Sequence, residues 1–162
     1  SAGTQLLPDS QLDRFMVRLN LGYPSITDEV EIMKNRQISN PLDTIQAIIT
    51  PQMMTTFQKQ VDQVFISDEI YYYIVAIVDA TRHNEYIEQG ASPRGSLATM
   101  KVAKACAFMH DRDYVIPSDV KDVVHMVLAH RIILNYDAKM KEMSAYSLLD
   151  DILDHIREPG IE

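Results

Sequence analysis

The chain has 162 residues, of which 46% are hydrophobic and 23% are charged, and its formal net charge is −8 at pH 7. This length suits one globular domain or slightly more, and the negative charge argues against broad binding to nucleic acid or an anionic membrane. The single cysteine, Cys106, excludes an internal disulfide and is expected to be a small buried hydrophobe. Because the sequence has no signal peptide and no apolar run of membrane-spanning length, a cytoplasmic location is expected.

Alternating hydrophobicity near the beginning predicts a β-strand. Apolar residues occupy every second position here: Phe15, Val17, Leu19 and Leu21. This period of two is typical of a strand with one buried face, and Gly22 ends it. Since no partner strand is evident elsewhere, we expect an orphan strand that pairs with, or lies on, another molecule. The chain is accordingly expected to be a C-terminal fragment cut inside a larger α/β domain.

Helical periodicity covers most of the remaining chain and predicts six helices. Each expected start has a capping hydroxyl, a proline or both. These starts are Ser25, Thr50-Pro51, Ser67, Ser92-Pro93, Pro117 and Ser144. The clearest apolar stripe begins at Val120, with the i, i+3, i+4, i+7, i+8 spacing of a buried helix face. The expected fold class is therefore all-α, a helical bundle of about six helices with one orphan N-terminal strand.

The segments between these helices are expected to be irregular. Residues 40–50 are predicted to form an extended loop, and residues 135–143 a polar connector. The run Tyr71-Tyr72-Tyr73 cannot all face one side of a helix. Some of these rings are therefore expected at the surface or at an interface.

Residues 90–95, GASPRG, have the glycine spacing of a phosphate-binding P-loop, but the rest of that motif is missing. A P-loop needs a lysine and a hydroxyl residue directly after its second glycine, whereas Ser96 and Leu97 follow here. Ser92 and Pro93 instead suit a helix start, which puts Arg94 in the first turn, where an arginine can bind an anion. The alternative interpretation is a solvated arginine beside a helix cap.

The sequence indicates neither a metal site nor a hydrolase active site. None of the five histidines forms an i, i+4 pair, and there is no HExxH motif, so no metal site is expected. No signature of a nucleophilic hydrolase occurs either.

Two motifs together resemble the MoxR-type AAA+ ATPases, over roughly residues 3–156. The first is LLPDSQLDRFMVRLNLGYPS, residues 6–25, which resembles the segment that carries that family's arginine finger and last core strand. The second is GASPRGSLATMKVAKACAFMHDRDYVIPSDVKDVVHMVLAHRIIL, residues 90–134, which resembles the family's lid. One departure from the pattern is Ile116, which stands where a capping residue is usual, so Ser118 is expected to cap one turn later.

The resemblance implies specific roles. Arg94 would be sensor 2, reaching the γ-phosphate of ATP in its own subunit, and Arg14 would be the arginine finger of the next subunit's site. Tyr23 and Pro24 would lie near the adenine. Residues 1–24 would be the end of the core and residues 25–158 the lid. Because the Walker A loop, Walker B and sensor 1 would precede residue 1, ATP and Mg²⁺ would bind the full-length parent, and the fragment alone is expected to be inactive.

The resemblance also implies partners. The parent would form a homo-oligomeric ring, expected to be a hexamer, and would remodel or assemble partner proteins, with a von Willebrand factor A domain protein as a possible client. Two alternatives remain open. One is a stand-alone acidic helical module for protein interaction. The other is a DNA-binding helical domain, suggested by the clustered Arg94, Lys101 and Lys104 but opposed by the net charge.

Overall fold

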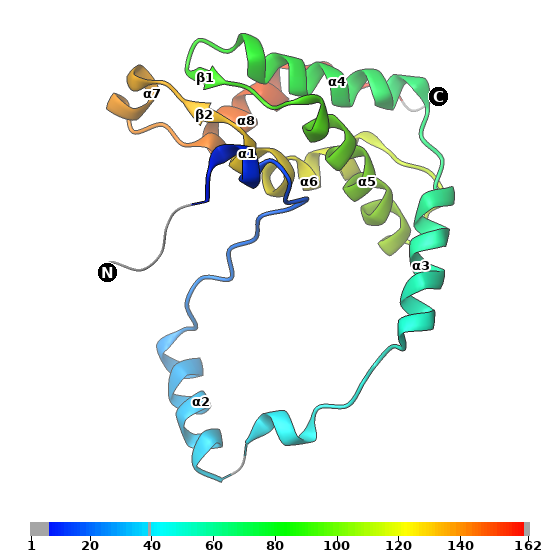
Figure 1. Cartoon of the computed structure of the whole chain (residues 1–162), viewed down its shortest axis with the longest axis vertical. Helices are drawn as coiled ribbons and strands as arrows, with labels where there is room; N and C mark the ends of the chain where they lie inside the picture. Colours follow the sequence, from blue (N-terminus) through cyan, green and yellow to red (C-terminus); the bar gives the residue numbers. More distant parts are fainter. Residues whose placement is uncertain (1–6, 39, 161–162) are drawn as a thin grey trace. The chain divides into compact units, whose positions relative to one another are not determined.

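The computed structural model describes residues 7–38 and 40–160 (Figure 1). Its first helices are α1 (Asp9–Leu12), α2 (Ile26–Ile38), η1 (Pro41–Thr44) and α3 (Pro51–Gln63). The next elements are α4 (Asp68–His83), β1 (Ile87–Gln89), α5 (Pro93–Met109) and α6 (Pro117–Leu128). The last are η2 (Ala129–Arg131), β2 (Ile133–Leu134), α7 (Tyr136–Met140) and α8 (Ala145–His155). The fold is mainly helical, as the sequence predicts.

Two compact units divide the chain. The first comprises the described parts of Ser1–Arg18 and Lys59–Glu162, and the second is Leu19–Gln58. The predicted boundary between residues 24 and 25 is not tested by this division and stays a prediction. Within the described residues, no helix is both long and apolar enough to cross a membrane.

All six predicted helices are present as α2, α3, α4, α5, α6 and α8. Several begin at the expected caps. Ser25 Oγ accepts the N–H of Asp28 at 3.2 Å, and Thr50 Oγ1 accepts the N–H of Met53 at 3.2 Å. Such bonds satisfy backbone donors that have no partner within the helix.

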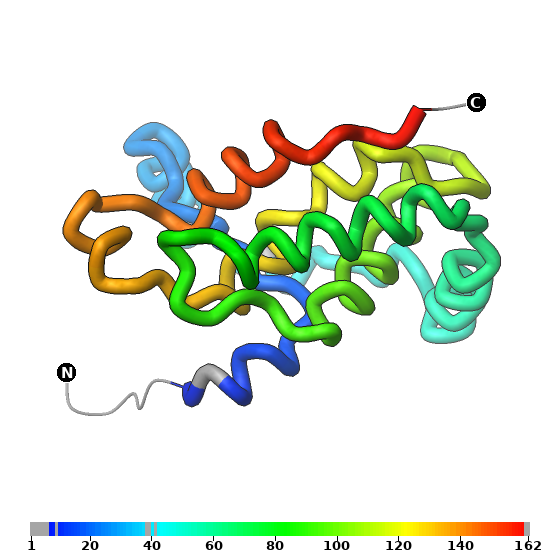
Figure 2. The backbone as a smooth tube through the Cα atoms, turned by 90° about the horizontal axis from the view of Figure 1, so that it is seen from above, coloured from blue at the N-terminus to red at the C-terminus, as the bar shows by residue number. Residues whose placement is uncertain are grey.

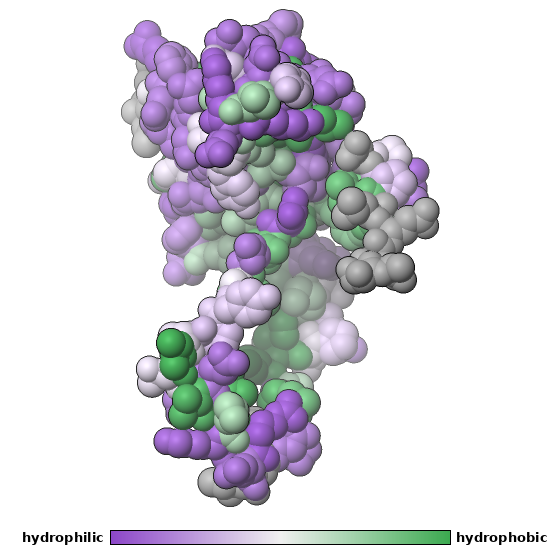
Figure 3. All heavy atoms as spheres, turned by 90° about the vertical axis from the view of Figure 1, so that its left-hand side faces the viewer, coloured by the Kyte–Doolittle hydropathy of each residue, from purple (hydrophilic) through white to green (hydrophobic). Residues whose placement is uncertain are grey.

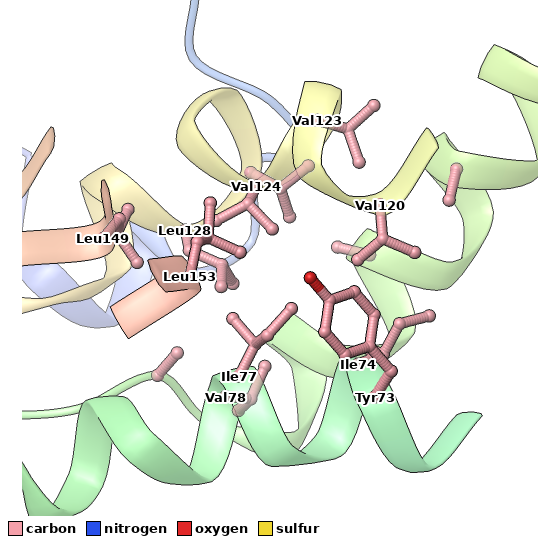
Figure 4. Close-up of a cluster of buried hydrophobic side chains, with 14 of the residues drawn as sticks. Tyr73, Ile74, Ile77, Val78, Val120, Val123, Val124, Leu128, Leu149 and Leu153 are labelled. Carbon is pink, nitrogen blue, oxygen red and sulfur yellow. The ribbon is translucent and has the colours of Figure 1, made fainter. Parts of the chain in front are cut away.

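The core of the first unit lies between α4, α5, α6 and α8, and α4 and α8 are side by side (Figure 2). The predicted stripe on α6 is buried in full: Val120, Val123, Val124, Val127 and Leu128. The labelled side chains of α4, α6 and α8 point toward one another (Figure 4). The tyrosine run divides as expected, because Tyr73 is buried in this core while Tyr72 is 79% exposed. Cys106 is also buried, as predicted.

Four short elements, β1, β2, α7 and η1, were not predicted from the sequence. Strands β1 and β2 pair antiparallel, with Ile87 opposite Leu134 and Gln89 opposite Ile133. Both are too short for an alternating pattern to stand out. The predicted polar connector contains α7, and the predicted extended loop contains η1.

The predicted strand over residues 15–21 is not formed among the described residues. Its expected pairing with another molecule stays a prediction. Part of the segment contacts the helical bundle, since the N–H of Arg18 donates to the carbonyl oxygen of Met126 at 2.8 Å. Backbone groups that would join a sheet ladder thus bind the end of α6 here.

The second unit has no core of its own. Every described side chain in it is exposed except Phe57, which is half-buried. Large apolar residues are therefore on its surface (Figure 3). The most exposed of them are Leu21, Tyr23, Ile26 and Ile48.

Candidate functional site

The start of α5 is built as the sequence predicts. Ser92 is the N-cap, with its Oγ accepting the N–H of Arg94 at 3.2 Å, and Pro93 occupies the first helical position. Arg94 is exposed in the first turn. A cation at this end gains nothing from the helix dipole, which favours anions there. The backbone N–H groups at this helix start and the Arg94 guanidinium would both attract an anionic ligand.

The two glycines around this cap serve close packing. A Cβ added to Gly90 would lie 2.7 Å from backbone atoms of Thr81 and Arg82 on α4. One added to Gly95 would lie 3.1 Å from Leu128 Cδ2 and 3.2 Å from Ala91 Cβ. The spacing that resembles a P-loop therefore has a structural cause, because α4 and α6 approach the chain too closely for a larger residue.

The residues before the cap are fixed to α4. Thr81 Oγ1 accepts the N–H of Ala91 at 3.0 Å and donates to the carbonyl oxygen of Val78 at 2.6 Å. Arg82 Nε donates to the carbonyl oxygen of Ala91 at 2.9 Å. The residues just before α5 are thus hydrogen-bonded to α4.

Asp13 joins the segment that bears Arg14 to the start of α5. Ser92 Oγ lies 3.2 Å from Asp13 Oδ1 and 3.1 Å from Asp13 Oδ2, and it donates to this carboxylate. Ser92 is two residues from Arg94, and Asp13 is adjacent to Arg14. The structure therefore brings together two segments that lie about half the chain apart in sequence.

Arg131 binds the same segment from η2. Its side chain is only 1% exposed, and Nε lies 3.3 Å from Asp13 Oδ1. Nη2 donates to the carbonyl oxygens of Asp13 at 3.2 Å and Phe15 at 2.6 Å. Nη1 donates to the carbonyl oxygens of Met16 at 3.2 Å and Val127. Burial lowers the pKa of Arg131, the Asp13 carboxylate opposes that shift, and the charge of Arg94 adds to it.

His130 completes this cluster. Its Nε2 lies 3.0 Å from the Phe15 carbonyl oxygen and 2.9 Å from Arg131 Nη1. Burial lowers the pKa of His130, the Phe15 carbonyl opposes the shift, and the neighbouring arginine charge reinforces it. The neutral imidazole is therefore favoured beside the buried guanidinium.

The predicted site residues fall into two groups. Arg14 and Arg94 both lie in the first unit, both are exposed, and neither guanidinium has a hydrogen-bond or ion-pair partner among the side chains that the structure describes. Tyr23 and Pro24 belong to the second unit, where both are exposed. A pocket of about 540 Å³ adjoins the cap of α5, with Asp13, Arg18, Ser92, His130 and Arg131 in its lining.

A second polar cluster stabilises the start of α6. Arg112 Nη1 and Nη2 donate to Asp119 Oδ2 at 2.6 Å and Oδ1 at 2.5 Å, and the N–H of Ile116 donates to Oδ2 at 2.9 Å. Burial alone would raise the pKa of Asp119, but these hydrogen bonds hold it below its ordinary value. The expectation that Ser118 caps this helix is wrong, because the helix already begins at Pro117 with Ile116 as its N-cap.

Cys106, His110 and Asp119 could supply metal ligands, since their candidate atoms lie within 4.8 Å of one another. The carboxylate, however, is already engaged by Arg112. Burial raises the pKa of the Cys106 thiol, and the charge of Asp119 acts in the same direction. A neutral thiol and a cation-paired carboxylate are poor ligands, so the geometry favours a structural role.

Sequence reasoning missed the roles of Asp13, His130 and Arg131. Asp13 stood beside Arg14 in the first motif, and the pair His130-Arg131 followed the apolar stripe of α6. The available signal was Arg131, three residues after the last apolar residue of a buried stripe, because charged residues in such places are buried only when paired.

Comparison with known protein families gives a match to part of the chain. Residues 79–152 match the family described as the AAA lid domain. This range runs from the end of α4 into α8, so the match lies within the helical bundle of the first unit.

Individual proteins similar to this chain include one that is named MoxR1. The chain is 38% identical over 157 residues to YeaC, an uncharacterised protein of Bacillus subtilis (strain 168), covering 97% of the chain and 49% of YeaC. It is 33% identical over 168 residues to the chaperone MoxR1 of Mycobacterium tuberculosis, covering 98% of the chain and 44% of MoxR1. A crystal structure at 2.00 Å of a candidate ATPase from Cytophaga hutchinsonii matches with a TM-score of 0.89 and 35% identity, covering 98% of the chain and 51% of that chain.

The chain is thus related to the MoxR-type AAA+ ATPases, and residues 79–152 are similar to the AAA lid domain. It spans about half the length of the curated relatives that it matches over nearly its whole length.

Proposed function

We propose that this chain supplies the nucleotide-sensing lid and the arginine finger of a MoxR-type AAA+ ATPase. The observation that carries the proposal is the contact between Asp13 and Ser92, 3.1–3.2 Å long. It holds the segment of Arg14 against the start of the helix that bears Arg94. Both guanidiniums remain exposed, as groups that meet a phosphate outside this unit must be.

The two arginines have different tasks in this proposal. Arg94 contacts the γ-phosphate of ATP bound by its own subunit and closes the lid on the nucleotide. Arg14 enters the site of the adjacent subunit, and Tyr23 and Pro24 lie near the adenine. Phosphoryl transfer spreads negative charge over the γ-phosphoryl oxygens, and an arginine finger that stabilises this charge contributes about 10³–10⁵ in rate. Arginine suits both tasks because it stays charged and presents a planar fork of donors.

ATP and Mg²⁺ are bound, in this proposal, by a longer protein that includes the phosphate-binding Walker A loop. No such loop occurs within the 162 residues. We therefore expect no measurable binding of Mg-ATP to this chain alone by calorimetry. Micromolar affinity would show that the nucleotide site is misassigned.

The work performed by the longer protein is proposed from its relatives. MoxR1 is named a chaperone, which supports coupling of ATP hydrolysis to remodelling or assembly of partner proteins. We propose a cytoplasmic homo-oligomeric ring, a hexamer, with a von Willebrand factor A domain protein as client. The net charge of −8 supports a protein client over nucleic acid.

Mixed rings test the division of tasks. Arg14→Ala leaves each subunit's own pocket intact, whereas replacement of the Walker A lysine leaves each subunit's finger intact. A ring that contains both variants has interfaces where an intact pocket meets an intact finger. ATP turnover is expected to reappear in these rings although neither variant is active alone.

Arg94→Ala is the matched control for this experiment. Arg94 and the Walker A lysine serve the same nucleotide pocket. Every subunit in a mixed ring of these two variants therefore has a defective pocket. Mixing Arg94→Ala with the lysine variant should therefore give no recovery. If rings shown to be mixed recover no turnover with Arg14→Ala, the finger assignment of Arg14 is wrong.

A further inference from the structure

The segment that bears Arg14 is short, exposed and has little apolar contact of its own. Helix α1 ends at Leu12, and the residues from Asp13 to Arg18 have no helix or strand. Only Val17 of this stretch packs against the core. A catalytic arginine must be held within a fraction of an ångström of its working position, so something else has to fix this backbone.

Arg131 provides that fixation. One buried guanidinium donates to the carbonyl oxygens of Asp13, Phe15 and Met16, which flank Arg14 on both sides. Its Nε is also paired with the Asp13 carboxylate. Five donors in a rigid plane suit this task, whereas lysine offers a single point charge.

Asp13 also connects this segment to the start of α5, where Arg94 lies. Asp13 accepts from Ser92 Oγ, and that hydroxyl also caps α5 just ahead of Arg94. The backbone of Gly95 approaches the Arg131 side chain as well, since a Cβ there would lie 3.6 Å from Arg131 Cδ. Arg131 thus fixes the Arg14 segment, and Asp13 joins that segment to Ser92, whereas the cap at Arg94 is made by the Ser92 hydroxyl itself.

We infer that Arg131 is a positioning residue for Arg14, and that it fixes the Arg14 segment to the start of α5 through Asp13 and Ser92. A rearrangement of the lid on its own nucleotide then moves the finger offered to the next subunit. This inference rests on the proposed function, because it assigns regulation to the same pair of arginines. Arg131 itself is buried and touches no nucleotide.

The test uses Arg131→Met in the longer, ring-forming protein. This variant keeps an unbranched side chain of similar reach but has no donors. Turnover should fall about 10-fold to 100-fold, because a displacement of about 1 Å in a positioned group has that effect. Mixing with the Walker A lysine variant should restore turnover, as for Arg14→Ala, because the lost function is the one offered to the neighbour.

Hydrogen exchange on the same protein provides a readout that does not depend on ATP. The amides of Phe15 and Arg18 should exchange at least about 10-fold faster in Arg131→Met, because local opening has lost its main restraint. Amides in α4 should be unchanged. Arg112→Met removes another arginine that holds a carboxylate, and it should not accelerate Phe15 or Arg18 more than α4.

Conservative variants keep the test decisive if Arg131→Met does not fold. Arg131→Lys retains the charge without the fork and should recover only part of the turnover. Asp13→Asn retains a Ser92 contact without the ion pair and should show the same exchange pattern in weaker form.

The outcomes separate the two levels of the proposal. The positioning role is overturned if Arg14→Ala rings are rescued by mixing but Arg131→Met rings retain normal turnover, or lose turnover without rescue. If Arg14→Ala itself has no effect on turnover, the proposed function fails, while faster exchange at Phe15 still establishes the structural part.

Discussion

The two units of this chain contrast in what their apolar residues do. In the first, helices α4, α5, α6 and α8 place their apolar faces against one another and exclude water. In the second, α2 and the residues around it have comparable apolar side chains, but these lie on the surface. Helical periodicity is present in both units. Burial therefore depends on whether a second apolar face is available, and the second unit requires one from outside itself.

The same contrast applies to polar residues. Asp119 in the first unit and Asp28 in the second both lie three residues after a helix N-cap. Asp119 is buried and bound by Arg112, whereas Asp28 is exposed and accepts from Ser25 Oγ at 2.7 Å. Substituting similar residues in the two units, one in each, tests how far the units differ.

The largest effect is expected at Asp119. Asp119→Ala leaves the Arg112 guanidinium without its carboxylate at the core boundary, which should lower the free energy of unfolding by about 3–5 kcal/mol. Asp28→Ala should change it by about 1 kcal/mol or less, because water replaces the lost contact. Urea denaturation followed by circular dichroism measures both. Equal effects would contradict the contrast between the units.

A pair of leucines gives the second test. Leu149 is fully buried on α8, and Leu21 is 98% exposed in the second unit. Leu149→Ala should reduce stability by about 2–5 kcal/mol through lost burial and a cavity. Leu21→Ala should change the free energy of unfolding by no more than about 0.5 kcal/mol relative to the unsubstituted chain. A large loss at Leu21 would mean that the second unit is covered in solution, for example by another copy of the chain.

The glycines beside the site give the third test. In Gly90→Ala the new methyl meets α4 backbone at 2.7 Å, and this backbone cannot move without disturbing the core. We expect a loss of about 1–3 kcal/mol, in the range of overpacked cores. Gly95→Ala meets side-chain atoms at 3.1 Å and 3.2 Å, which can adjust, so its melting temperature should fall less. The reverse order would show that the loop yields more easily than α6.

The smallest effect has the opposite sign. Tyr73 is 3% exposed, its ring lies in the core (Figure 4), and its hydroxyl has no hydrogen-bond partner among the described residues. Tyr73→Phe removes this unsatisfied group and should raise the free energy of unfolding by about 0.5–1 kcal/mol. Tyr23→Phe, at a 99% exposed position, should have no effect on thermal unfolding. Destabilisation by Tyr73→Phe would indicate a partner for the hydroxyl in solution.

Local sequence determined the helices of this protein and the start of the candidate site. Helix-capping residues such as Ser92 and Ser144 act within a few residues of themselves, and the α6 stripe needs only helical spacing, so both were predictable. The two motifs indicated the family relation that the comparisons support. The place of Arg94 in the first turn of α5 could also be predicted.

Only the tertiary structure decided how these parts are joined. Hydrogen bonds from Arg131 to the carbonyls around Arg14 span more than 110 residues of sequence, so no local pattern encodes them. The period of two in residues 15–21 specifies a strand only where a neighbouring strand supplies hydrogen bonds, and here α6 and η2 bind part of that backbone instead. Likewise, the apolar spacing of α2 predicts a helix but does not specify what covers its apolar side chains. The described residues of the second unit provide no surface that buries them. Local propensity selects the element, while the available partner decides what the element binds.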